Sequence, residues 1–325
     1  MVDLIAPLRF AAGGVSSKTT NPELCHFLIR DGRVTGYDGV LTMSAPIEVG
    51  LNMMPRAAKL VEAIKAAPDN AEIALAKTPA GKLSIKAGKF KVFVDCLPDD
   101  YSLLVPMPEG AICPGSSELL PAIQAAIPFC ADGKGPTWSQ GLRFHGASVY
   151  ATNSLVLLEK YHGCNIPHEF IIPVAAAKEL LKIKDPISHL QVGENSVTFH
   201  FGDKWLRTAL VSGKWPDNVE PMFGMPGNRE PLPEGFFDAC KTLAAVPLDE
   251  EATQKLHFRD GLVSNSPSDD VGSSIEMHVA SAGIFPLEQL LLLEGVAANI
   301  AWSTYPKPCP FMGEKLRGIL LGFQR

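Results

Sequence analysis

One pattern recurs along this chain of 325 residues, and the repeat limits the fold more than any single motif does. Segments with the apolar spacing of helices start 51 to 63 residues apart, near residues 3, 54, 117, 173, 232 and 286. Each is followed by short stretches in which apolar and polar residues alternate between turn residues, which is typical of antiparallel strands. A repeat of this length predicts one helix-plus-strands unit used six times.

Two such units together have the size of an ordinary domain. The repeat therefore predicts three similar domains, at residues 1–110, 111–222 and 223–325. The boundaries fall in Pro- and Gly-rich joints, which are short and semi-rigid. The predicted fold class is α+β, in which each domain combines two units of one helix and antiparallel strands.

A strand, a tight turn and a second strand are predicted three times, around Gly32, Gly146 and Gly261. Each glycine follows Asp or His between apolar alternations, and it would supply the positive φ that a hairpin turn favours. Proline stands at the start of three of the helices, where its missing N–H costs nothing.

The composition is that of a globular protein, with 46% hydrophobic residues and a formal net charge of −6. A chain that is acidic overall does not bind nucleic acid as histones do, so any such contact needs a local concentration of Lys and Arg. The N-terminus carries Asp3 and no signal-peptide pattern. Glu288 and Glu294 interrupt the most apolar stretch, which predicts a core segment rather than a membrane span. We expect a cytoplasmic protein without a membrane partner.

The side chains that usually carry chemistry form no recognisable site. Seven cysteines are scattered without a C-x-x-C pair, which indicates free thiols in a reducing compartment. His162, Cys164 and His168 lack a fourth ligand at tetrahedral spacing, so neither a metal nor another cofactor is predicted. The nucleophile-elbow, zinc-protease and dinucleotide motifs are absent from the sequence. The sequence favours a non-enzyme; an α+β hydrolase with a site assembled across domains is the alternative.

Two of the predicted helices carry lysines opposite their apolar stripes. In residues 56–67, Lys59 lies on the face opposite the stripe, and in residues 174–184 Lys178 and Lys182 do so. A solvated face would explain one such helix. Because the same polarity recurs at matching places of the repeat, a shared cationic surface is the hypothesis that we favour.

The second predicted domain resembles the bacterial DNA polymerase III beta subunit, the sliding clamp. Four segments carry the resemblance: the strand end Ala151–Ser154, the helix Pro173–Leu181, the hairpin Val192–Gly202 and the run Val211–Asn218. The first predicted domain matches as well, in SSKTTNPELCHFLIRDGRVTGYDG and FKVFVDCLPDDYSLLVP. The chain departs from the family in three respects: it is shorter, it has ATNSLVL where clamps have A-T-D-G-H-R-L, and it lacks their terminal Met-Pro-Met. A phage-borne or otherwise divergent member would fit these departures.

The resemblance implies a DNA clamp fold, with helices lining the inside of a ring and sheets outside. It also implies a head-to-tail homodimer that encircles double-stranded DNA without reading its sequence. Such a processivity factor tethers DNA polymerase, and it meets the polymerase and the clamp loader through short peptide motifs in a hydrophobic groove. A clamp-like scaffold or decoy that has lost loading is a further alternative.

The resemblance also suggests which residues act. Contacts to the DNA backbone would come from Arg9, Lys18, Arg56, Lys59, Lys134, Lys178, Lys182 and Lys241. The partner-peptide groove would be lined by Thr152, Leu155, Leu157, Pro221, Leu320 and Leu321. Ring closure would use an edge strand bearing Val92 and Val94, although these two valines could equally face their own domain's core.

Overall fold

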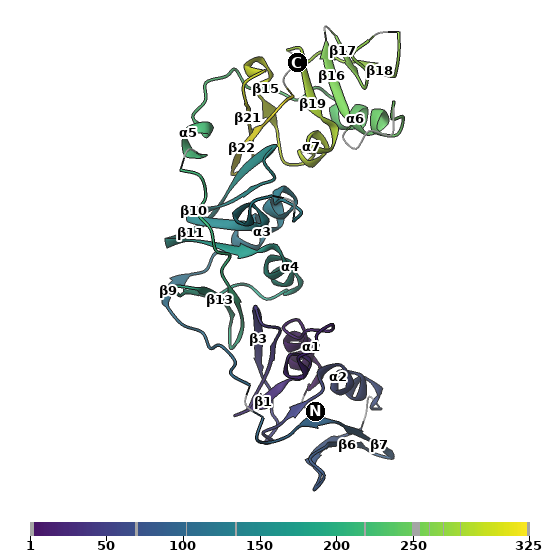
Figure 1. The fold of residues 1–325 in the computed structure, drawn as a ribbon, viewed down its shortest axis with the longest axis vertical. Coiled ribbons are helices and arrows are strands. Elements are labelled where there is room, and N and C mark those ends of the chain that lie inside the picture. Colours follow the sequence, from purple (N-terminus) through teal and green to yellow (C-terminus); the bar gives the residue numbers. More distant parts are fainter. Residues whose placement is uncertain are drawn as a thin grey trace. The chain divides into compact units, whose positions relative to one another are not determined.

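The computed structural model describes residues 3–68, 71–101, 103–133, 135–217, 219–248, 254–259, 261–268, 270–279 and 281–323 (Figure 1). The chain forms two compact units. Unit 1 contains Met1–Ser117 and Ala175–Leu210, and unit 2 contains Glu118–Val174 and Val211–Arg325. The middle of the chain thus contributes to both units. The division into three domains stays a prediction.

Unit 1 is built on a seven-stranded antiparallel sheet. Its two halves meet where β3 pairs with β14, with Trp205 opposite Ser44 and Thr208 opposite Leu41. Strands from two distant parts of the sequence therefore share one sheet. The strand order is β1 (Leu28–Arg30), β2 (Arg33–Tyr37), β3 (Leu41–Pro46), β14 (Lys204–Ala209), β13 (Ser196–Phe201), β12 (His189–Val192) and β9 (Ala111–Pro114).

Unit 1 also has two smaller sheets. One holds three strands, β5 (Ile73–Lys77), β6 (Leu83–Ala87) and β7 (Phe90–Val94), and the other pairs β4 (Met54–Pro55) with β8 (Cys96–Leu97). Within the described part of the chain, β7 pairs with β6 alone, so it is an edge strand.

The helices of unit 1 are α1 (Ile5–Ala12), α2 (Ala57–Ala66) and α4 (Val174–Lys182), with a 3₁₀ turn at Pro22–Cys25. They lie on one side of the seven-stranded sheet (Figure 1). Helix α1 packs on β2, β3 and α2, and its Phe10 ring lies 6.4 Å from that of Phe201 on β13. The apolar stripe of α2, including Leu60 and Ile64, is buried in the core of this unit, as its spacing predicts.

Unit 2 contains a six-stranded and a four-stranded antiparallel sheet. The order of the first is β10 (Gly141–Thr152), β11 (Val156–Pro173), β22 (Leu316–Leu320), β21 (Cys309–Gly313), β20 (Asn299–Ile300) and β15 (Glu230–Pro231). The order of the second is β18 (Ser274–Glu276), β17 (Leu262–Ser264), β16 (Lys255–Arg259) and β19 (Gly283–Pro286).

The helices of unit 2 are α3 (Leu119–Ala126), α5 (Val219–Phe223), α6 (Phe236–Ala244) and α7 (Leu287–Leu292), with 3₁₀ turns at Ile127–Phe129, Thr137–Gln140 and Trp302–Thr304. Helix α3 packs on β10 and β11, and α6 packs on α7. Beneath α6 and α7, an aromatic cluster fills the core, with ring centroids 5.0 to 6.1 Å apart in Phe236, Phe258, Phe285 and Trp302.

All six predicted helices are confirmed, as α1, α2, α3, α4, α6 and α7. The turns at Gly32 (φ +71°) and Gly261 (φ +72°) are confirmed too. The hairpin predicted around Gly146 is wrong, because β10 runs through this residue and is interrupted by a bulge instead. Gly146 has its positive φ at this bulge. The chain reverses direction only at residues 153–155, between β10 and β11. Among the described residues, no helix is long and apolar enough to cross a bilayer.

Candidate functional site

A mainly apolar pocket of about 130 Å³ lies in unit 2, where four segments of the chain meet. The first segment is the turn between β10 and β11, the second contains Trp215 and α5, the third is the end of β22, and the fourth is the 3₁₀ turn that bears Trp138. The lining residues are Trp138, Thr152, Ser154, Leu155, Val156, Leu157, Trp215, Pro216, Val219, Met222, Ile319 and Leu321.

The turn between β10 and β11 is held by its own short polar side chains. The Asn153 side-chain oxygen accepts hydrogen bonds from the backbone N–H groups of Leu155 (3.1 Å) and Val156 (2.9 Å). The Asn153 amide also donates to Gln289 of α7 at 2.6 Å. Ser154 can therefore keep its positive φ of 75°, and Leu155 is presented to the pocket.

Aromatic rings pack behind the pocket. The Trp138 and Trp215 centroids are 5.2 Å apart, and the Tyr150 ring lies 6.3 Å from that of Trp215. The Arg143 guanidinium lies over both Tyr150 and Trp215, and it donates a hydrogen bond to Glu169 at 2.8 Å. Rings that are packed in this way make a stiff wall that can bury an apolar side chain of a ligand.

A polar cluster joins α5 to the six-stranded sheet. Arg317 of β22 donates hydrogen bonds to Glu159 of β11 and, at 3.1 Å, to Glu220 of α5. The Tyr150 hydroxyl lies 3.0 Å from Glu159 and 2.9 Å from Glu220. Burial, together with these two carboxylates, raises the pKa of Tyr150, so its hydroxyl keeps its proton and remains a donor at neutral pH.

Four of the six residues predicted for the groove line this pocket, namely Thr152, Leu155, Leu157 and Leu321. The other two lie elsewhere. Leu320 is fully buried on the opposite face of its strand, because successive side chains of a strand alternate. Pro221 is exposed on α5, whereas its neighbour Met222 lines the pocket.

The sequence reasoning missed several lining residues. Trp215 and Pro216 stand where the clamp family has Phe and Pro of its G-x-F-P run, so that motif could have pointed to them. Val219 and Met222 are three residues apart on α5, a helix that the repeat did not predict. Trp138 lies in a 3₁₀ turn, and no feature of the sequence marks it.

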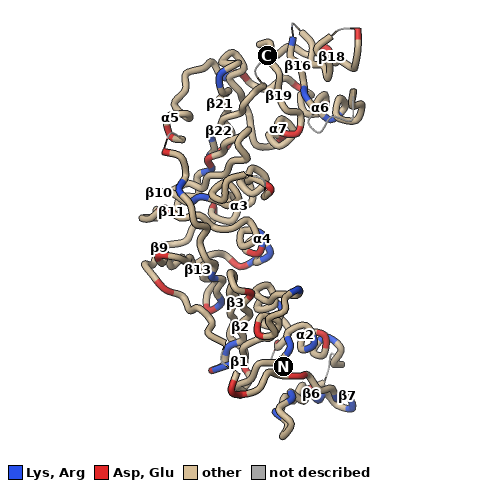
Figure 2. The backbone as a smooth tube through the Cα atoms, viewed as in Figure 1, with Lys and Arg blue, Asp and Glu red and all other residues tan. Residues whose placement is uncertain are grey.

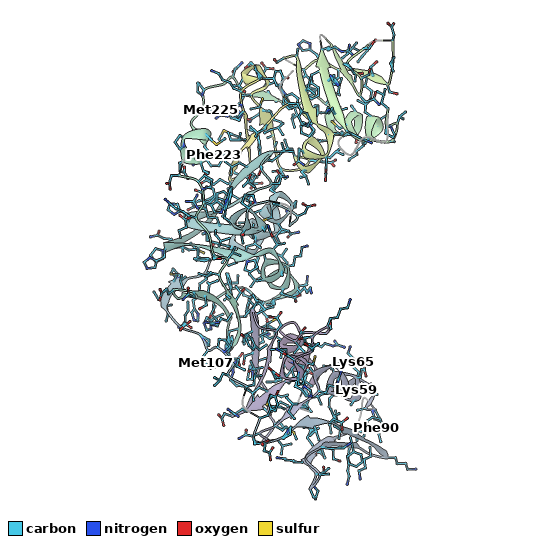
Figure 3. All side chains as sticks on the ribbon, viewed as in Figure 1. Lys59, Lys65, Phe90, Met107, Phe223 and Met225 are labelled. Atoms are coloured by element: carbon cyan, nitrogen blue, oxygen red, sulfur yellow. The ribbon has the colours of Figure 1, made fainter. Side chains whose placement is uncertain are left out.

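In unit 1, the predicted DNA-contacting cations lie on exposed positions of the helices and their flanking segments. Lys59 of α2 is 68% exposed and pairs with Glu62 at 3.2 Å (Figure 3). Lys182 of α4 pairs with Glu179 at 2.5 Å, and Lys178 is exposed on the same helix. Basic and acidic residues alternate along α2 and α4 (Figure 2). The remaining exposed candidates of this unit are Arg9, Lys18 and Arg56.

In unit 2, the predicted DNA-contacting lysine on a helix is already paired with carboxylates. Lys241 on α6 donates to Glu294 at 2.5 Å and lies 3.9 Å from Asp238. The hydrogen bond to Glu294 raises the pKa of Lys241 and largely satisfies its charge. Lys134, another predicted contact, lies outside the described residues.

The two valines predicted for ring closure face the core of unit 1, which is the alternative that the sequence left open. Val94 is 2% exposed within the core cluster, and Val92 packs against that cluster. The alternation of β7 turns Lys91 and Phe93 outward instead, and Phe93 is 50% exposed. An interface at this edge would therefore use Phe93 and the strand backbone, with Val94 as support from inside.

His162, Cys164 and His168 do not gather into a metal site. His162 and Cys164 point into the core from β11, and His168 is exposed further along the strand. Among the described residues, His, Cys, Asp and Glu form no group of three that could hold a metal ion.

Comparison with known proteins gives one consistent result. The chain is 24% identical over 251 residues to the beta sliding clamp of Salmonella typhimurium and 25% identical over 244 residues to that of Escherichia coli K12. These alignments cover 66% of the chain, which spans 64% of the length of the curated relatives that it matches. No protein-family model matches the chain.

Solved structures are similar in fold over 99% of the chain. The DNA polymerase sliding clamp of Bacillus subtilis superposes with a TM-score of 0.81 at 18% identity, over 99% of this chain and 97% of that one. A Pseudomonas aeruginosa sliding clamp that was solved bound to griselimycin superposes with a TM-score of 0.80, with the same identity and coverage. The chain therefore has the fold of the bacterial DNA polymerase sliding clamps, and 66% of it is similar in sequence to beta sliding clamps.

Proposed function

We propose that this chain is a DNA polymerase processivity factor, a non-enzymatic clamp that encircles duplex DNA and tethers replication proteins. The observation that carries the proposal is the apolar pocket, which occurs at four of the six positions where the resemblance implies a partner groove, in a chain with the clamp fold. A protein with this role would act in the cytoplasm, where replication takes place.

The proposed DNA contact is electrostatic and independent of sequence. The exposed lysines of α2 and α4 would contact phosphate oxygens, and lysine lacks the planar fork with which arginine reads base edges. Since a closed ring retains DNA by topology, weak phosphate contacts are sufficient, and the net charge of −6 prevents tight general binding. This combination suits a protein that must slide.

The proposed occupant of the pocket is a short peptide of a partner protein, such as a polymerase or a clamp loader. The pocket has apolar walls from Leu155, Leu157, Met222 and Leu321, together with stiff aromatic rings. It is small, and it fits one or two apolar anchor side chains better than a folded surface. The Pseudomonas relative, which was solved with griselimycin, suggests that compound as a competing probe.

The proposed ring consists of two copies of the chain. Edge strand β7 has unpaired backbone groups within the described residues and bears the exposed Phe93, so it can accept a strand from a second copy. Head-to-tail pairing at both ends would close the ring.

A linearisation experiment tests the proposal directly. The protein is loaded on nicked circular DNA by a clamp loader, isolated with the circle, and the DNA is then cut once. We expect release on cutting, because a ring slides off a free end, and retention on the uncut circle. Retention is followed by gel filtration of labelled protein. Protein that stays bound to linear DNA at moderate salt would show ordinary affinity and would contradict the proposal.

A further inference from the structure

Helix α5 has five residues, which is too few for a helix to be stable by itself. It nevertheless supplies Val219 and Met222 to the pocket. The shape of the pocket therefore depends on the tertiary contacts that hold α5 against the six-stranded sheet. Val219 and Phe223 provide apolar contacts, since both are buried in the cluster that also contains Tyr150 and Ile319.

The polar contacts of α5 come from side chains that are fixed in the sheet. Arg317 and Glu159 stand directly opposite each other on β22 and β11. From there, the Arg317 guanidinium reaches Glu220 of α5 at 3.1 Å, and it lies 4.5 Å from the ring centroid of Phe223. Arg317 thus contacts both the second and the last residue of α5.

Arg317 is the positive charge in the cluster that it forms with Tyr150, Glu159 and Glu220. The Tyr150 hydroxyl is close to the carboxylates of both Glu159 and Glu220, but it has one proton and cannot fully donate to both. The guanidinium, with five N–H donors and a positive charge, compensates both carboxylates at once. Without it, two negative charges would face each other across one phenol, and the repulsion would weaken the attachment of α5 to the sheet.

We propose that Glu220 and Arg317 are positioning residues for the partner pocket, because they hold α5 so that Val219 and Met222 form its wall. Neither residue lines the pocket itself. This inference rests on the proposed function, in which the pocket receives a partner peptide.

The test compares Glu220→Ala and Arg317→Met with the unmodified protein in binding a fluorescein-labelled peptide copied from the C-terminus of the cognate polymerase. We expect about fivefold weaker binding in each variant, because the competent position of α5 becomes only partly populated. The loss should arise from slower association with unchanged dissociation. Stopped-flow anisotropy measures both rates, and the binding stoichiometry should remain one peptide per chain.

Two further variants separate positioning from general damage. Glu220→Gln keeps an oxygen that can accept hydrogen bonds from Tyr150 and Arg317, so it should restore most of the affinity that Glu220→Ala loses. Lys214→Met is the matched control, since its 2.8 Å ion pair with Asp217 precedes α5 and is exposed to solvent. It should bind like the unmodified protein.

Added salt should weaken peptide binding less in Glu220→Gln than in the unmodified protein, because the ion pair between Glu220 and Arg317 is already absent from that variant.

The outcomes test the positioning role of Glu220 and Arg317 separately from the proposed function of the pocket. Normal association rates in Glu220→Ala and Arg317→Met would overturn the positioning role and leave the proposed function intact. A reduced stoichiometry with unchanged rates would indicate unfolded protein and would also overturn it. An unmodified protein that does not bind the peptide at all would instead count against the pocket as the partner site.

Discussion

Leu320 and Leu321 are adjacent and chemically identical, yet they have different surroundings in unit 2. Leu320 is fully buried in the core, whereas Leu321 lines the pocket. The backbone N–H of Leu321 donates to the carbonyl of Leu155 at 2.8 Å, which continues the pairing of β22 and fixes the direction of both side chains. Substitutions at these neighbours should therefore affect different properties.

At the residue scale, we expect Leu155→Ala and Leu321→Ala each to weaken binding of the polymerase peptide by about 1–2 kcal/mol, because each removes a wall of the pocket. Leu320→Ala should lower the free energy of unfolding by about 2–5 kcal/mol, because it leaves a cavity in the core. Calorimetric titration and urea unfolding measure the two effects. Pro221→Ala, at an exposed position, is the control and should bind normally. Unchanged affinity in both leucine variants would mean that the peptide binds elsewhere.

At the element scale, β7 shows how one strand can serve a core and a surface together. Its inward residue Val94 packs among buried side chains of unit 1, including Leu83 and Ile85. Its outward residue Phe93 lies under Lys91, whose ammonium is 4.8 Å from the ring centroid. An exposed aromatic residue on an edge strand is a typical site of association between chains.

Two variants of β7 should therefore behave differently. Val94→Asp should destabilise unit 1 by about 3–5 kcal/mol, because it buries an unpaired carboxylate. Phe93→Glu should leave thermal unfolding almost unchanged while lowering the fraction of dimer in native mass spectra. A fully folded, dimeric Val94→Asp protein would show that Val94 is not a core residue. A fully dimeric Phe93→Glu protein would show that this face is not the interface.

At the scale of the whole molecule, basic residues are unevenly distributed among the helices. The helices α1, α2 and α4 of unit 1 carry five Lys or Arg and two Glu. The helices α3, α5, α6 and α7 of unit 2 carry one Lys and three acidic residues. We therefore expect phosphate contacts to come mainly from unit 1, including Lys65, which was not among the predicted contacts.

Salt dependence tests this asymmetry. The double variant Lys178→Ala, Lys182→Ala should reduce the slope of log affinity against log salt by about 1–2 for a short linear duplex, since each lost phosphate contact removes roughly 0.9 from the slope. Lys241→Ala should change the slope less, because two carboxylates, Glu294 and Asp238, lie beside that lysine, whereas Glu179 is the carboxylate that pairs with Lys182. Fluorescence anisotropy at several salt concentrations provides the slopes. A larger effect at Lys241 than at the two lysines of α4 would reverse the assignment.

Much of the local structure could be predicted because its causes are local. Apolar spacing and turn residues act over a few positions, and they were sufficient for six helices and for the turns at Gly32 and Gly261. Gly146 shows the limit of this reasoning: a positive φ is compatible with both a hairpin turn and a bulge, and pairing with the partner strand selects between them. Helix α5 was missed for a similar reason, since tertiary contacts rather than helix-forming residues hold it.

The sequence by itself determined the repeat, the α+β class and the resemblance to sliding clamps, because these depend on the order of residue types along the chain. The tertiary structure decided which side chains share a site, because that depends on strand pairing and side-chain direction. Leu321 rather than Leu320 meets the β10–β11 turn, and Val94 rather than Phe93 faces the core. Similarly, Lys241 donates a hydrogen bond to Glu294, which is 53 residues away in the sequence. Such distant pairs form only when the elements pack, so local patterns cannot predict them.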